Sequence, residues 1–228
     1  MEIKYSWRFC LAFMAFVFVF GQLHEMAHLT VAYLVCGCPG KQVDFNLWTF
    51  GADCVNNPNT YIATMTGPVF SYLLMWAGYF LLRSTNSRWR NTGLVLVMGN
   101  LPFARIFTAA MGGGDETTVL KQLIHNQPLL VIKAIGFVLV FMLAFPPLFM
   151  VFKRLLNRYK VWHLVGLCLM PMIIMMLYEF KLLGKVLQAG FLSDMHFLGV
   201  ADFIYIHTFI MVLIVLYYRK TLFLGGTE

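Results

Sequence analysis

The first apolar stretch of the chain, from Trp7 to about Cys36, is long enough to cross a lipid bilayer, yet it contains two histidines and a glutamate. At about 1.5 Å per residue, a helix of this length exceeds the roughly 30 Å of hydrocarbon in a bilayer. Ionisable side chains at that depth are costly unless they pair or bind something. The stretch therefore predicts a membrane helix that carries a functional polar site just past its midpoint.

The ionisable residues of this stretch form the pattern His24-Glu25-Met26-Ala27-His28. On a helix, His24 and His28 lie one turn apart on the same face, so both imidazoles can reach one metal ion. Glu25 lies beside them, where its carboxylate can take a proton from a metal-bound water. This spacing is typical of zinc hydrolases. The alternative is a pair of core histidines that bind no metal.

Composition places the rest of the chain in a membrane as well. Of the 228 residues, 60% are hydrophobic and only 12% are charged, far from the balance of a soluble domain. We therefore predict an all-α polytopic membrane protein that forms a single domain over 1–228, with its N-terminal stretch retained and not cleaved as a signal peptide. About six transmembrane helices are expected, over Trp7–Cys36, Thr60–Leu82, Thr92–Met111, Pro128–Phe152, Val161–Leu183 and Gly199–Tyr218. The third of these is expected to break near Asn100 and Pro102.

The net charge of +7 comes from basic residues at the ends of the apolar runs, where they set topology and contact the lipid bilayer. Nucleic acid is therefore not expected as a partner. The side of the termini carries Lys4, Arg8, Arg83, Arg88, Arg90, Lys153, Arg154, Arg158, Lys160, Arg219 and Lys220, and the opposite side only Lys41, Lys121, Lys181 and Lys185. The positive-inside rule places both termini in the cytosol. A bacterial or archaeal inner or plasma membrane is the expected location.

A short hairpin is predicted after the first helix, which Gly37-Cys38-Pro39-Gly40 brings to an end. The alternation of apolar and polar residues in Val43–Leu47 predicts a strand, and Phe50–Val55 is expected to return as a second strand. This hairpin would lie against the membrane beside the histidines. The chain has five cysteines, an odd number without CxxC pairs, so a disulfide framework is not predicted. A bridge from Cys54 to Cys36 or Cys38 is an alternative.

A tetrahedral zinc with an open catalytic position needs a third protein ligand besides two histidines. Four side chains at or near membrane depth are candidates: Asp115, Glu179, Asp202 and His207. Asp115 is favoured, because the glycines at 112–114 let the backbone turn toward the first helix. Glu179 is instead expected to pair with Lys181, and Asp202 to form a polar patch with His207.

The motifs of residues 9–116 resemble those of the site-2-protease-type intramembrane zinc metallopeptidases. The matches occur in that family's order: His24 to His28, then Cys36-Gly37 before a strand, Gly67-Pro68, Asn100 with Pro102, and Asp115. The resemblance implies a catalytic core over about 7–116, with additional transmembrane helices over about 128–218. It implies one Zn²⁺ per chain held by His24, His28 and Asp115, with Glu25 as the general base or acid and Asn100 near the scissile carbonyl.

The expected function is zinc-dependent intramembrane proteolysis, in which a peptide bond within or near the transmembrane segment of a membrane protein is hydrolysed. By the same resemblance, the strand after the motif would pair with an unwound single-span substrate. Gly67, Pro68 and Pro102 are interpreted as packing or gating positions, because glycine permits close helix approach and proline loosens the backbone ladder.

Two positions depart from the family pattern and point to a divergent, compact member without a PDZ domain. Ser71 stands where the family usually has asparagine, and Asp115-Glu116 stands in place of the family's Asp-Gly, after a longer insert. Many family members also turn the end of the motif helix toward the cytosol, the opposite of the orientation that the basic residues indicate.

Other functions are also compatible with the sequence. A non-proteolytic membrane protein is one, either a transporter or a pseudo-protease that binds single-span partners. The intact Glu25 argues against a pseudo-protease, and the lack of internal repeats argues against a transporter. A prenyl-protein-type membrane zinc peptidase would need Glu179 as the third ligand in place of Asp115. The sequence does not predict the oligomeric state.

Overall fold

A computed structural model describes residues 1–3, 5–54 and 57–224 of the chain, and its longest element is the helix α1 (Trp7–Cys36). The helix begins where Ser6 Oγ accepts a hydrogen bond from the backbone N–H of Phe9, at 3.1 Å. It ends at Gly37, whose φ of 70° lies in the left-handed region that glycine adopts without strain. The predicted bounds of the first helix are confirmed.

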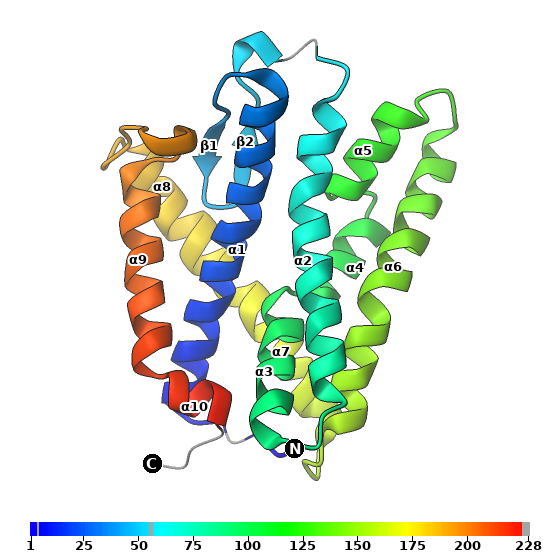
Figure 1. Ribbon diagram of the computed structural model, residues 1–228, viewed down its shortest axis with the longest axis vertical. Coiled ribbons are helices and arrows are strands. Elements are labelled where there is room, and N and C mark those ends of the chain that lie inside the picture. The colour runs from blue at the N-terminus through cyan, green and yellow to red at the C-terminus, as the bar shows by residue number, and fades with distance from the viewer. Residues whose placement is uncertain (4, 55–56, 225–228) are drawn as a thin grey trace.

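Most of the described residues are helical (Figure 1). After α1 come α2 (Thr60–Leu82), α3 (Ser87–Gly99), α4 (Pro102–Ala110), α5 (Asp115–Leu123), α6 (Leu129–Arg154), α7 (Lys160–Ile174), α8 (Gly184–Gln188), α9 (Asp202–Tyr217) and α10 (Arg219–Leu224). Short 3₁₀ turns cover Ala52–Cys54 and Phe197–Gly199.

Among the described residues, five helical segments are long and apolar enough to cross a bilayer: Trp7–Cys36, Thr60–Leu82, Ser87–Ala110, Leu129–Arg154 and Lys160–Gln188. The sixth predicted span corresponds to α9, which is apolar but has 16 residues. That length is about 24 Å of helix, short of the roughly 30 Å of a bilayer core. The structure is thus compatible with a multi-pass membrane protein, with five helices of spanning length where the sequence predicts six.

Two of these segments are irregular. The segment Ser87–Ala110 breaks between α3 and α4, where Leu101 has φ 53° and ψ 54° and Pro102 is the first residue of α4. The break predicted from Asn100 and Pro102 is confirmed, because proline fits the first turn of a helix but not its interior. The segment Lys160–Gln188 contains a π-helix over Met175–Leu183, a rare form that occurs mostly as single-turn bulges inside α-helices and is frequent at functional sites.

The predicted hairpin exists, but its turn comes earlier than expected. Strand β1 (Lys41–Asp44) pairs antiparallel with β2 (Leu47–Thr49), so the predicted strands Val43–Leu47 and Phe50–Val55 are misplaced. The chain turns at Phe45 and Asn46, where Asp44 Oδ1 accepts a hydrogen bond from the Phe45 N–H at 2.7 Å. Val55 lies outside the described residues.

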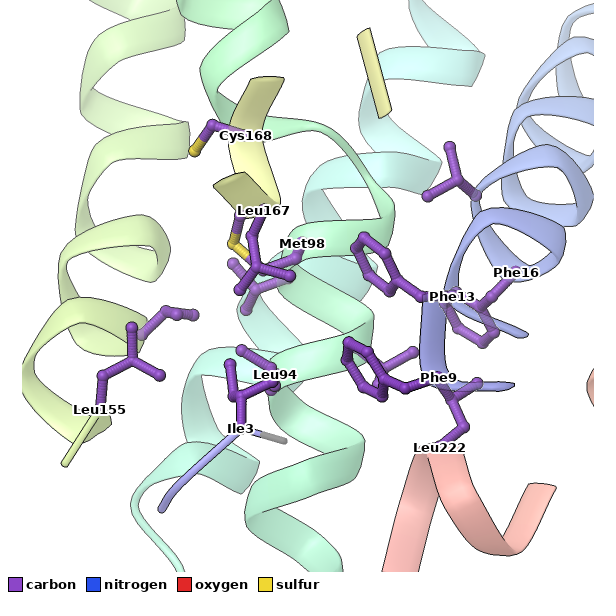
Figure 2. Close-up of a cluster of buried hydrophobic side chains, with 14 of the residues drawn as sticks. Ile3, Phe9, Phe13, Phe16, Leu94, Met98, Leu155, Leu167, Cys168 and Leu222 are labelled. Atoms are coloured by element: carbon purple, nitrogen blue, oxygen red, sulfur yellow. The ribbon is translucent and has the colours of Figure 1, made fainter. Parts of the chain in front are cut away.

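A hydrophobic cluster holds the helices together at one end of the molecule (Figure 2). It joins the first turns of α1 to α3, α7, α10 and the end of α6, through side chains that include Phe9, Phe13, Phe16, Leu94, Met98, Leu155, Leu167 and Leu222. Other large apolar side chains point outward, such as Leu130 on α6 (78% exposed) and Trp162 on α7 (74% exposed). An apolar outer surface of this kind fits a lipid environment.

The hairpin lies at the end of the molecule opposite the N-terminus (Figure 1). At the hairpin end, a disulfide joins Cys36, the last residue of α1, to Cys54, with 5.4 Å between their Cα atoms. It is one of the two bridges considered from the sequence, and Cys38 is free. At the other end, the N-terminal amine donates to the carbonyl of Arg154 and the Ile3 N–H donates to Asn157 Oδ1.

Candidate metal centre

His24 and His28 present their Nε2 atoms to the same point, 3.0 Å from each other. Their Nδ1 atoms are held by α2: that of His28 lies 2.8 Å from the Ala63 carbonyl, and that of His24 lies 3.0 Å from Ser71 Oγ. A hydrogen bond donated by Nδ1 fixes the tautomer whose Nε2 lone pair is free for a metal. The spacing seen in the sequence therefore places both imidazoles as expected for metal ligands.

Asp115 completes this group from α5. Its Oδ2 atom lies 3.4 Å from the Nε2 atoms of both His24 and His28. Gly112 and Gly114 have φ values of 77° and 88°, so these two glycines make the left-handed turns that bring Asp115 to α1, as the sequence predicts. Burial raises the pKa of Asp115, but the nearby imidazoles of His24 and His28 outweigh burial and hold the pKa below its usual value. The carboxylate is therefore ionised.

The three ligand atoms fit a tetrahedral metal ion. With metal–nitrogen distances of about 2.0–2.1 Å, tetrahedral ligands lie about 3.3–3.4 Å apart, and the separations here are 3.0, 3.4 and 3.4 Å. Among the described residues, His24, His28 and Asp115 are the one such group of His, Cys, Asp or Glu that can hold a metal ion. Three ligands leave a fourth position open, as in catalytic zinc sites.

The imidazoles of His24 and His28 pack against Gly67 of α2. A Cβ atom at this position would lie 2.7 Å from His24 Cε1 and would overlap His28 Nε2. Only glycine therefore lets α2 approach the histidines this closely, which specifies the packing role predicted for Gly67. Pro68 follows it inside α2 and is buried. Gating by Pro68 or Pro102 stays a prediction.

Glu25 is buried beside the two histidines, with 5% of its surface exposed. Its Oε2 atom has no hydrogen-bond partner among the described residues. Burying an unpartnered carboxylate oxygen is costly, and a metal-bound water is the kind of group that would satisfy it. This orphaned oxygen is a second feature, independent of the ligand distances, that fits a hydrolytic metal centre.

No protein family, curated protein or solved structure compared with the chain matches it. The resemblance to site-2-type proteases stays a resemblance of motifs. The functional conclusion therefore depends on the geometry of the site.

A cavity of about 230 Å³ opens beside the metal centre. Its polar lining includes His24 of α1, Asn46 of the hairpin turn, Ser71 of α2, Asn100 at the end of α3, Arg105 of α4, and Asp115 with Glu116 of α5. Asn100 lines this cavity, and its Nδ2 donates to the Leu96 carbonyl at 2.8 Å. Its role near the scissile carbonyl stays a prediction. The break between α3 and α4 thus brings two polar residues of an apolar segment to the site.

The sequence interpretation missed a polar network behind His24. Arg105 Nη2 lies 2.8 Å from Ser71 Oγ and 3.0 Å from His24 Nδ1. Its Nη1 lies 3.5 Å from Glu116 Oε1, which also accepts a hydrogen bond from the Tyr72 hydroxyl at 2.6 Å. A lone arginine inside an apolar run was the signal that could have identified this network, because such a charge needs a partner.

The remaining candidate ligands do not join the metal centre. Glu179 lies in the π-helix, buried, and its Oε2 atom has no partner among the described residues. The predicted pair with Lys181 is wrong, because two residues this close on a helix point to different sides and Lys181 is exposed. The predicted patch of Asp202 with His207 is also wrong. Asp202 contacts His196 at 3.0 Å, and His207 is buried among aromatic rings.

Proposed function

We propose that the chain is a zinc-dependent intramembrane endopeptidase, which hydrolyses a peptide bond within or near the transmembrane segment of a single-span membrane protein. The convergence of His24, His28 and Asp115 with an orphaned Glu25 oxygen is the observation that carries this proposal. Two of the three ligands belong to a helix long and apolar enough to span a bilayer. This location distinguishes an intramembrane peptidase from a soluble one.

The roles of the chain's own residues follow from their positions. His24, His28 and Asp115 hold the ion, which when bound supplies a Lewis acid and a water of lowered pKa. The unpartnered Oε2 atom of Glu25 accepts the proton of the attacking water and passes it to the leaving amine. The cavity beside the ion has polar walls and can admit both water and an extended peptide.

A helical substrate must unwind to be cut, because its amides are hydrogen-bonded within the helix. The hairpin is close enough to help, since Asn46 in its turn lines the cavity and the Trp48 ring of β2 stacks on His28 with centroids 5.0 Å apart. Pairing of the unwound segment with a hairpin strand would hold it beside the metal. This role of the hairpin is part of the proposal.

The rival functions have less support. A prenyl-protein-type peptidase would need Glu179 at the metal, and Glu179 is not part of the convergent group. A pseudo-protease would have no use for a buried, unpartnered glutamate beside the ligands. A transporter would bind an ion without hydrolysing a peptide, and activity measurements separate it from an enzyme.

The orientation we propose places both termini in the cytosol of a bacterial or archaeal cell, with the hairpin on the outer face. The excess of basic residues on the terminal side supports it. The Cys36–Cys54 disulfide supports it independently, because disulfides persist in oxidising compartments and are rare in the cytosol. Lys4, one of the basic residues counted, lies outside the described residues.

Glu25→Gln tests the proposed function. Wild type and variant are purified in mild detergent without chelators, and each is measured for zinc by elemental analysis and for cleavage of a synthetic transmembrane peptide that contains helix-breaking residues. We expect about one zinc per chain in both proteins and cleavage by wild type alone. Glu179→Gln is the matched control, a second buried glutamate with an unpartnered oxygen, and should keep both zinc and activity. Cleavage by Glu25→Gln at the wild-type rate would contradict the proposal.

A further inference from the structure

Arg105 is the one cationic side chain that lines the cavity beside the metal centre in the part of the chain that the structure describes. Its side chain is 18% exposed. It belongs to α4, within a segment apolar enough to span a bilayer, where an arginine is costly unless it is used. The positive charge of Arg105 is therefore expected to have a functional role.

The guanidinium is held in place from two helices. On α2, Ser71 Oγ lies 2.8 Å from Nη2, and the Tyr72 ring lies under the guanidinium with 5.6 Å between Cζ and the ring centroid. On α5, the buried Glu116 carboxylate lies 3.5 Å from Nη1 and is itself fixed by the Tyr72 hydroxyl. Arg105 is thus a positioned group, as preorganised electrostatic catalysis requires.

The protons around His24 leave Arg105 with donors to spare. When His24 Nε2 faces a metal, His24 Nδ1 carries a proton and cannot accept a hydrogen bond from Arg105. Ser71 Oγ then accepts from both His24 Nδ1 and Arg105 Nη2. The contacts with Ser71 and Glu116 occupy two of the five N–H groups of a guanidinium. The other donors remain available to a group bound in the cavity.

We propose that Arg105 is a catalytic residue that binds the oxyanion formed on the scissile carbonyl, an inference that rests on the proposed peptidase function. The water oxygen bonds to the carbonyl carbon, its proton passes to Glu25, and the electron pair of the carbonyl bond moves onto oxygen. Arg105 donates an N–H to that oxygen. When this tetrahedral intermediate collapses, the electron pair on oxygen re-forms the carbonyl double bond and the carbon–nitrogen bond breaks. The amine leaves with the proton from Glu25.

The proposal predicts a specific kinetic pattern. Loss of one oxyanion donor lowers kcat by about 100- to 1,000-fold. The neutral carbonyl of the bound substrate gains less from a cation than the oxyanion does, so KM should change far less than kcat. A group that only positions His24 would act differently, because its loss would first weaken the metal site.

The test compares Arg105→Gln with Arg105→Lys, and adds the double variant Arg105→Gln/Glu116→Gln, which leaves no unpaired Glu116 charge. For each protein, zinc content, kcat, KM and the affinity for a phosphinic peptide, a tetrahedral anion that mimics the oxyanion, are measured. We expect full zinc content in all three. In the Gln variants, kcat and phosphinic peptide affinity should fall by similar factors, and Arg105→Lys should recover part of both.

Ser71→Ala separates the catalytic role from a positioning role. It removes the hydroxyl that contacts both His24 and Arg105 but leaves the guanidinium charge in place. It should lower zinc affinity more than it lowers the affinity of the zinc-loaded protein for the phosphinic peptide. If Arg105→Gln instead loses zinc as Ser71→Ala does, or binds the phosphinic peptide as wild type does, the catalytic role is wrong while peptidase activity stands. A zinc-loaded wild type that cleaves nothing would overturn the peptidase function and this role together.

Discussion

Gln22 of α1 and Gln42 of β1 exchange two hydrogen bonds between their side-chain amides, 2.8 and 3.0 Å long. Gln42 has no exposed surface, and its Nε2 also donates to the Phe45 carbonyl at 3.1 Å. Across the hairpin, Gln42 is the register partner of Trp48, whose ring stacks on His28. The amide pair therefore fixes the hairpin to the helix of the metal centre, close to its ligands.

Removal of one amide from this pair should destabilise the protein. Gln42→Ala leaves the buried Gln22 amide without its partner, at a cost of about 1–3 kcal/mol. Thermal unfolding in detergent measures the loss, and a double-mutant cycle with Gln22→Ala isolates the pair. We expect a coupling energy of at least about 0.5 kcal/mol, and simple additivity of the two single losses would show that the pair does not act as a unit.

Gly67→Ala should lose the metal with the ligands intact. The added methyl group would meet both imidazoles, which must move apart or force α2 away. Zinc content by elemental analysis is expected to fall far below that of wild type. Gly166→Ala is the matched control, because this glycine also lies in an apolar helix and a Cβ there meets no atom within 4 Å. A fully zinc-loaded Gly67→Ala protein would mean that the imidazoles bind elsewhere.

Asp115→Asn should weaken zinc binding much more than Glu179→Gln. A neutral amide is a poorer zinc ligand than a carboxylate, and Asp115 is the acid whose oxygen lies 3.4 Å from both imidazoles. Titration with a competing chelator compares the two affinities. Unchanged affinity in Asp115→Asn together with a loss in Glu179→Gln would favour the prenyl-protein-type arrangement.

The proposed orientation predicts which engineered cysteines an impermeant thiol reagent can reach on intact cells. In a protein that lacks Cys10, Cys38 and Cys168 but keeps the Cys36–Cys54 bridge, a cysteine at Asn59 should react and one at Thr85 should not. Both positions are exposed, and they lie at opposite ends of α2. Labelling at Thr85 alone would mean that the hairpin and the disulfide face the cytosol.

Local patterns in the sequence predict much of this fold. Apolar run length gives the bounds of α1 and α2 correctly, and Asn100 with Pro102 locates the break between α3 and α4. The hairpin turn was misplaced because the alternation of apolar and polar residues continues through Phe45 and Asn46, where the chain turns. The pairing of Cys54 with Cys36 and not Cys38 depends on where α1 ends in space, which periodicity does not show.

The candidate metal centre was predictable only where residue spacing encodes it. The helical repeat alone aligns His24 with His28, and glycines before Asp115 mark a turn. Arg105 and its partners come from three helices, and such contacts between distant segments leave no local pattern. The π-helix around Glu179 was missed for the same reason, because a wider helical turn is imposed by packing and not by residue type.

Asp115 is the first residue of a helix of only nine residues, too short to be stable by itself. One side of α5 packs closely against α6: a Cβ added to Gly136 of α6 would lie 2.9 Å from Thr117 Oγ1 of α5. On its other side, Glu116 accepts a hydrogen bond from the Tyr72 hydroxyl of α2, and Asp115 meets the imidazoles of α1. An ion at this point would act as a removable cross-link between two segments far apart in the chain, and its binding energy would become folding energy. Folding of the protein would then depend on the availability of the metal. Helix α1 can insert into the membrane first, and α5 becomes fully stable only when the ion binds.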